Sequence, residues 1–504
     1  MKHWNKAIAI GLCACMMGTA AFAEGGDTDA VTSATQKPQS AQSQQTPPAM
    51  PGQQNQDGQN RQMPPTMPGQ QMPGGQNRMT PPAMPGQQGQ DGQNRQTPPA
   101  LPGQQNQDGQ NGQTPQFPGG QNGPQSGKPG GMPGGMPGGM GGPGGQSAPT
   151  EYSAANTVSE SSAGASYVSS AADENAVLVS QGSVTLSGST VSKTGSSNGD
   201  SADFYGINAA VLATNGSALT IEDAQITSDG SHANGVFSYG SGTTVNVSNT
   251  AITTSGNCSG GLMTTGGATL NATDVTVATS GNSSAAIRSD RGGGTVNVSG
   301  GSYDTAGVGS PAIYSTADIT VSDATLRATA SEAVVIEGGN SVTLTNVDIS
   351  GSNTKLNGQS TVNTNVLIYQ SMSGDASEGA STFTMSDSAM TAATGAMFHV
   401  TNTTTTINLE NVDFTYASDS SVFLSASGDS WGRSGQNGGQ VTLNLKNQDI
   451  TGAILSDSVS SVTVNLDAAS TWTLTGDSYV TAFNGDLSRV NLNGYILYVN
   501  GEAV

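Results

Sequence analysis

From residue 211 to residue 350 the chain repeats one short alternation of apolar and polar residues about every 23 to 26 positions. The best aligned copies are Leu219-Thr-Ile221, Val245-Asn-Val247, Val296-Asn-Val298, Ile319-Thr-Val321 and Val342-Thr-Leu344. Each repeat carries three strands that are too short to bury themselves alone, so only the stacking of successive repeats can form a core. The period therefore predicts a solenoid.

A turn residue follows each copy at the same place. Two positions after the last apolar residue stands an Asp, an Asn or a Gly, the residues that tolerate a left-handed backbone. This column consists of Asp223, Asn249, Asp274, Gly300, Asp323, Asn346, Asp387, Asn411 and Asn447. We predict an all-β fold, a right-handed parallel β-helix with an Asp/Asn ladder at one corner. It should occupy residues 151–504 in about 13–14 coils of about 25 residues.

The first 23 residues have the layout of a secretory signal peptide. Lys2 and Lys6 precede an apolar run, and Ala21-Phe-Ala23 is typical of a cleavage site. This predicts Sec-type export and an extracellular or cell-surface location. An alternative is a lipoprotein, because Leu12-Cys-Ala-Cys15 loosely resembles a lipobox with Cys15 as the lipidated residue.

Residues 24–150 form a low-complexity linker. A 17-residue repeat begins at Thr46, Met63, Thr80, Thr97 and Thr114 and decays into Gly, Met and Pro. Such a composition cannot build a core, which predicts a disordered stalk of Pro, Gly, Gln and Met. Met132, Met136 and Met140 leave Cu(I) binding open as an alternative to a decaying repeat, since thioethers are soft ligands.

The balance of charge restricts the partners. From residue 151 onward there are 8 Lys+Arg against 30 Asp+Glu, so the net charge is 8 − 30 = −22. This surface repels phosphate backbones and anionic membranes, so we expect neither nucleic acid nor an anionic membrane as a partner. No stretch beyond the leader has the roughly 18 apolar residues of a membrane span. The charge suits cations, or uncharged glycans approached through their hydroxyls.

This pattern resembles the pectate-lyase-like superfamily of parallel β-helices. It is more closely similar to adhesin-like β-helix proteins of gut bacteria and to autotransporter passengers, which share stretches such as STWTLTGDSYVT at Ser470–Thr481 and VNG at Val499–Gly501. The resemblance implies a secreted bacterial rod. It does not imply one activity, because β-helices include lyases, hydrolases, adhesins and inert rods.

Two enzyme classes of this fold can be tested against the chain. Galacturonase-like hydrolases carry Asp-Asp and His-Gly motifs, and this chain has neither, which disfavours a hydrolase. A Ca²⁺-assisted polysaccharide lyase stays open as an alternative, with Arg291 or Arg433 as the base. Asp290 and Arg291 form a Gly-rich turn after Ala286-Ile-Arg288, on the side where pectate-lyase-like clefts lie. A solvated turn is the simpler interpretation of that turn.

Irregular spacing gives the stronger indication of a binding site. The ladder is interrupted by insertions at residues 351–365, 370–380 and 425–440, and insertions in solenoids commonly cluster on the binding face. The last insertion holds Asp429, Trp431 and Arg433, near Tyr369 of a first strand. Trp431 could stack on a sugar ring, or it could pack the loop back onto the rod.

A column of Asn and Thr on the second strand offers a further alternative. Its members are Thr220, Asn246, Asn271, Asn297, Thr320, Thr343, Thr384 and Asn408. Such arrays can order water, as in ice binding, but cross-strand hydrogen bonding is their ordinary role. Together these features predict a non-enzymatic, adhesin-like rod that binds a polysaccharide or a host or matrix glycoprotein. It would need no cofactor, whereas the lyase alternative would need Ca²⁺.

The linker should be dispensable for the fold, because its composition cannot offset an ordering cost of about 1 to 2 kcal/mol per residue. We expect a chain that starts near residue 151 to keep the β-sheet circular dichroism and the Tm of the full chain. A large loss of Tm on truncation would contradict this interpretation.

Overall fold

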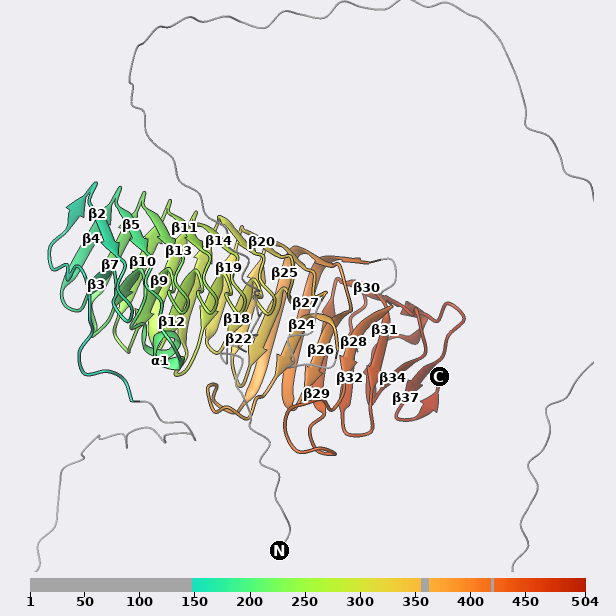
Figure 1. Cartoon of the computed structure of the whole chain (residues 1–504). Helices are drawn as coiled ribbons and strands as arrows, with labels where there is room; N and C mark the ends of the chain where they lie inside the picture. The colour runs from blue at the N-terminus through green and yellow to red at the C-terminus, as the bar shows by residue number, and fades with distance from the viewer. Residues whose placement is uncertain (1–146, 355–361, 418–420) are drawn as a thin grey trace, which may run out of the picture. The chain divides into compact units, whose positions relative to one another are not determined.

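The computed structural model describes residues 147–354, 362–417 and 421–504. The predicted signal peptide, Cys15, the three stalk methionines and nearly all of the predicted linker lie outside these residues. The described chain is a parallel β-helix, as predicted: strands stack in register along one axis (Figure 1). None of its helices is long and apolar enough to cross a membrane.

Three strand positions recur in each coil, and we call the resulting columns the first, second and third stacks. The first stack is an 11-stranded parallel sheet. It consists of β3 (Val177–Val179), β6 (Val211–Ala213), β9 (Val236–Tyr239), β12 (Leu262–Thr265), β15 (Ile287–Ser289), β18 (Ile313–Ser315), β21 (Val334–Glu337), β24 (Thr364–Tyr369), β26 (Ala396–Thr401), β28 (Val422–Ala426) and β31 (Ala453–Ser456).

The second and third stacks together form a 21-stranded sheet. The second stack consists of β1 (Ser162–Ala163), β4 (Ser183–Ser187), β7 (Ala218–Glu222), β10 (Thr244–Ser248), β13 (Ala268–Thr273), β16 (Gly294–Ser299), β19 (Asp318–Ser322), β22 (Ser341–Thr345), β25 (Ala380–Ala392), β27 (Thr403–Tyr416), β29 (Gly439–Lys446), β32 (Ser461–Leu466) and β35 (Ala482–Asn484). The third stack consists of β2 (Ser166–Ser169), β5 (Thr190–Lys193), β8 (Gln225–Ser228), β11 (Ala251–Thr254), β14 (Thr276–Thr279), β17 (Ser302–Thr305), β20 (Thr325–Ala328) and β23 (Asp348–Gly351), and β25 and β27 then continue it.

Two small sheets close the C-terminal end. One is parallel and consists of β30 (Asp449–Thr451), β33 (Thr471–Thr473) and β36 (Val490–Asn491), and the other consists of β34 (Ser478–Val480), β37 (Leu497–Val499) and the antiparallel β38 (Glu502–Ala503). A 3₁₀ turn, η1 (Leu487–Arg489), precedes β36. The thirteen strands of the second stack, one in each coil from β1 to β35, mark thirteen coils in the described residues, within the predicted range.

The core is a set of inward columns. Leu219 pairs with Val245, Val245 with Leu270, and Val296 with Ile319, which is the predicted alignment of the repeats. All are buried in one continuous cluster along the rod. Near the C-terminal end the fully buried Trp472 belongs to the same cluster, and its indole N–H donates to the carbonyl of Gly452 at 2.9 Å.

The Asp/Asn ladder is confirmed as a column of left-handed turns. All nine predicted members have φ between 45° and 73°. Within the ladder, Asn346 Nδ2 donates to Asp323 Oδ1 at 2.7 Å, and Asn411 Nδ2 donates to Asp387 Oδ1 at 2.8 Å. The side chains are exposed, so the ladder lies on the surface of the rod.

The predicted Asn/Thr column also bonds to itself. Asn271 donates to Asn246 and Asn297 donates to Asn271, each at 2.9 Å, and a second run continues through Asn408, Asn444 and Asn465 to Asn484. These amides are donors and acceptors for one another along the axis. Cross-strand bonding, the ordinary role of such a column, is therefore present here.

Substitution in the ladder separates conformational strain from lost hydrogen bonding. Asn346→Val forces a β-branched residue into φ of 53° and removes the bond to Asp323, so we expect a loss of about 1 to 3 kcal/mol in the free energy of unfolding. Asn346→Gly keeps the backbone conformation and removes only the bond, so its loss in urea unfolding should be smaller. Equal losses for the two variants would show that strain is not what selects Asn at this position.

Candidate functional site

The outer face of the first stack is covered, and the cover begins with one short helix. α1 (Asp200–Tyr205) lies between β5 and β6 in the chain and beside β12 in space (Figure 1). Thr265 Oγ1 of β12 donates to the carbonyl of Phe204 at 2.7 Å. Gly206 ends the helix at φ of 71°, and a Cβ there would lie 2.8 Å from Leu212 Cδ1. The repeat pattern does not predict this helix.

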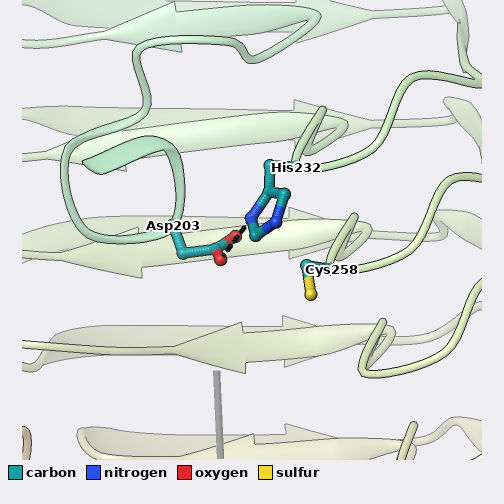
Figure 2. A group of neighbouring side chains, drawn as sticks. All are labelled: Asp203, His232 and Cys258. Carbon is teal, nitrogen blue, oxygen red and sulfur yellow. Dashed lines mark hydrogen bonds and ion pairs between the residues drawn. The ribbon is translucent and has the colours of Figure 1, made fainter. Parts of the chain in front are cut away.

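A buried cluster of charged side chains joins α1 to the rod. Asp203 Oδ2 lies 2.8 Å from His232 Nδ1 (Figure 2), and Asp203 Oδ1 lies 3.6 Å from the guanidinium of Arg288. Arg288 also pairs with Asp290 at 3.0 Å. The side chains are 8 % exposed or less. Two carboxylates thus face one guanidinium and one imidazole, which makes the cluster nearly neutral when His232 is protonated.

Cys258 lies beside this cluster but does not make it a metal site. Its Sγ, His232 and Asp203 place their ligand atoms within 4.8 Å of one another (Figure 2). Asp203 and His232 already pair with each other, so we assign no metal here.

The two charged side chains of the predicted Asp290–Arg291 turn pair with different residues. Asp290 is buried and pairs with Arg288, while Arg291 pairs with Asp375 of the 370–380 insertion at 2.6 Å. The Arg291 guanidinium also lies 4.0 Å from the centroid of the Phe204 ring. The simpler interpretation of a solvated turn is therefore wrong, because this arginine joins two segments distant in sequence.

The predicted loop site at residues 425–440 is closed. Trp431 is 6 % exposed, and its ring lies 5.0 Å from that of Tyr369, which is fully buried. Trp431 therefore packs the loop onto the rod, which is one of the two predicted roles. Its ring does not present an open face for stacking on a sugar in this structure. Ligand contact at Trp431 itself stays an untested prediction.

The polar residues of that loop differ in their burial and in their partners. The Asp429 side chain is buried and lies 3.3 Å from His399 Nε2, whereas Arg433 is exposed. Asn437 Nδ2 donates to the carbonyls of Asp429 and Trp431 and so fixes the turn between them. Arg433 is thus not brought together with the other predicted residues.

A buried carboxylate that the sequence pattern does not indicate lies next to these residues. Glu337 is 1 % exposed and accepts hydrogen bonds from the hydroxyls of Tyr314 and Tyr369, and also from Ser371 and Ser373 of the 370–380 insertion. Burial raises the pKa of Glu337, although these hydroxyl bonds oppose that shift. Its signal in the sequence is weak: a single acid at the end of an apolar strand.

An open concave surface lies elsewhere, along the ladder. A groove of about 490 Å³ runs between the second and third stacks, and it is lined by Asp323, Ala324, Thr325, Asn346, Val347, Asp348, Asp387, Ser388, Ala389, Asn411 and Asp413. A second cavity of about 370 Å³ shares Asn411 and Asp413 with it and continues to Asn447, Asp449 and Ala469. The two form one surface groove along the axis, which we call the ladder groove.

Comparisons of the chain with protein-family models, with curated proteins and with solved structures found no match.

Three buried titratable groups hold their proton more tightly in the folded state than in the unfolded state. Burial raises the pKa values of Glu332 and Glu337. Burial lowers the pKa of His232, but the hydrogen bond and charge of Asp203 outweigh it and raise that pKa overall. Each folded pKa lies above its unfolded value of about 4.3 for Glu and about 6.5 for His. Their stabilisation is therefore complete below those values and is lost as pH rises through the folded pKa values.

We accordingly expect the Tm to be higher near pH 5 than near pH 8. Glu332→Gln should flatten this slope, because a neutral amide can still contact Ser331 and Asn353, the partners of the carboxylate. Glu160→Gln, at an exposed position, is the control and should leave the slope unchanged. A Tm that rises from pH 5 to pH 8, or equal slopes for the two variants, would contradict the assignment.

Proposed function

We propose that this chain is a secreted or surface-tethered, adhesin-like rod without enzymatic activity that binds a polysaccharide or a host or matrix glycoprotein. The single observation that carries the proposal is the ladder groove, an open surface that crosses several coils in one direction. With about 4.8 Å between coils, the five steps from Asp323 to Ala469 span roughly 24 Å. That length suits several residues of a linear polymer.

The chemistry of the ladder groove suits hydroxyl-rich ligands. Carboxylates accept hydrogen bonds from sugar hydroxyls, and amides both donate and accept. Asp348 and Asp413 point outward from the third stack, and Asn346 and Asn411 stand on the ladder opposite them. No Lys or Arg lines either cavity, so a neutral or cationic glycan fits this groove better than a polyanion.

The predicted leader and linker support the same role. A Sec-type signal peptide would export the rod, or Cys15 would anchor it as a lipoprotein. A linker of about 127 residues would span on the order of 60 Å as a coil. A rod at the end of such a tether could reach a surface beyond the cell wall.

The lyase alternative is favoured by one observation at Arg291. Asp375 contacts its guanidinium, Asp290 precedes it, and the charges of Arg291 and Asp375 both act on Asp200. A cluster of carboxylates beside an arginine is what a Ca²⁺-assisted lyase needs. However, the bond and the charge of Asp375 raise the pKa of Arg291 against the effect of burial, so the guanidinium is not a ready base.

A glycan array probed with and without Ca²⁺ tests the proposal, together with an assay for unsaturated sugar products. We expect binding to at least one neutral or amino-sugar glycan and no product release. Product release that depends on Ca²⁺ would favour the lyase instead, and no binding to any glycan would count against both.

The site itself is tested by the double variant Asp348→Ala and Asp413→Ala. Both side chains are exposed and line the ladder groove, so we expect binding at least tenfold weaker with an unchanged Tm. Asp304→Ala is the matched control, because Asp304 is exposed on the third stack but does not line the groove. Equal affinity of the double variant and the control would place the ligand elsewhere.

A further inference from the structure

Residues 370–379 connect β24 to β25 and lie on the outer side of the first stack. We call this segment the strap. Asn402 Nδ2 donates to the carbonyl of Gln370 at 2.7 Å at its start, and Gly339 N–H donates to the carbonyl of Ser377 at 2.9 Å near its end. Between these points, two sets of polar contacts attach it to the rod.

The first attachment is the ion pair of Asp375 with Arg291. Both Nε and Nη2 of Arg291 donate to Asp375 Oδ1, at 3.0 and 2.6 Å. The guanidinium also lies against the ring of Phe204 in α1. Arg291 therefore holds the strap and α1 together, although Phe204 and Asp375 lie far apart in the chain.

The second attachment is the carboxylate of Glu337. Ser371 Oγ and Ser373 Oγ of the strap donate to Oε1, while the hydroxyls of Tyr314 and Tyr369 donate to Oε2. One oxygen thus serves the strap and the other serves the rod. Removal of the serine hydroxyls would leave the tyrosine contacts in place.

Apolar packing contributes little to the closed strap. Its one large apolar side chain, Met372, is 60 % exposed, and Ala376 is its only buried apolar residue. The close approach is made over glycines: a Cβ on Gly338 would lie 2.5 Å from the carbonyl oxygen of Ser377. Segments with few buried apolar contacts are those that open locally at low free-energy cost.

We propose that the strap is a releasable cover that opens as a unit while the β-helix stays folded, with Arg291–Asp375 and Glu337–Ser371/Ser373 as its two latches. Opening exposes the Glu337 carboxylate and the hydroxyls of Tyr314 and Tyr369, which are otherwise buried on the outer face of the first stack. The loop at residues 425–440 stays closed in this motion, because the buried Trp431 anchors it. This device is separate from the ladder groove and does not depend on glycan binding there.

Hydrogen–deuterium exchange of the full chain, read by mass spectrometry over residues 337–341 and 370–379, tests the proposal. Asp375→Asn weakens the first latch, and the double variant Ser371→Ala and Ser373→Ala removes the second. Each should speed exchange in both peptides by roughly tenfold, the factor that corresponds to about 1.4 kcal/mol of lost hydrogen bonding. Glu378→Gln is the matched control, since Glu378 is exposed on the same strap.

The Tm and the exchange of the inward columns should stay at the values of the unmodified chain in all these variants. Faster exchange confined to the two peptides would support the releasable strap. If exchange at the latch variants equals that of Glu378→Gln, the latches do not hold the strap. A fall in Tm that accompanies faster exchange would show that the strap is part of the cooperative fold, which also overturns the proposal.

Discussion

In-register stacking of short parallel strands is the interaction on which the rest of this protein depends. The backbone of each coil is hydrogen-bonded to the coils on either side of it. Inward residues such as Leu219, Val245 and Leu270 therefore lie over one another. Residues about one repeat apart therefore become neighbours in columns. The ladder, the amide column and the ladder groove are all consequences of this one register.

The three outer faces of the rod are used differently. On the second and third stacks, outward residues such as Asn246 and Asp413 are exposed, and a polymer could lie across them. On the first stack, the outward residues Phe237, Met263 and Leu367 are buried. This face is therefore covered by other segments of the chain, among them α1 and the strap. The ladder groove lies on the exposed corner between the other two stacks.

Buried polar groups decide where these insertions dock. Arg288 pairs with Asp203 and Asp290, and Glu337 accepts hydrogen bonds from hydroxyls of both the rod and the strap. An unpaired charge at such a position costs several kcal/mol, so the pairs select one docking arrangement even where they add little net stability. Polar contacts also allow the strap to be held without a large apolar anchor.

The sequence by itself determined the β-helix, the ladder and the number of coils, because these follow from local rules repeated every coil: alternation along Leu219-Thr-Ile221 and left-handed turns at Asn249 or Asp274. The exposed groove could have been expected from that ladder, and continuously apolar first strands such as Val334-Val-Ile336 signal a face covered on both sides. Only the tertiary structure decided that α1 and the strap provide the cover, that Arg291 pairs with Asp375, and that Trp431 is buried. Those contacts join segments tens of residues apart across irregular loops, where no period relates the partners and packing alone selects them.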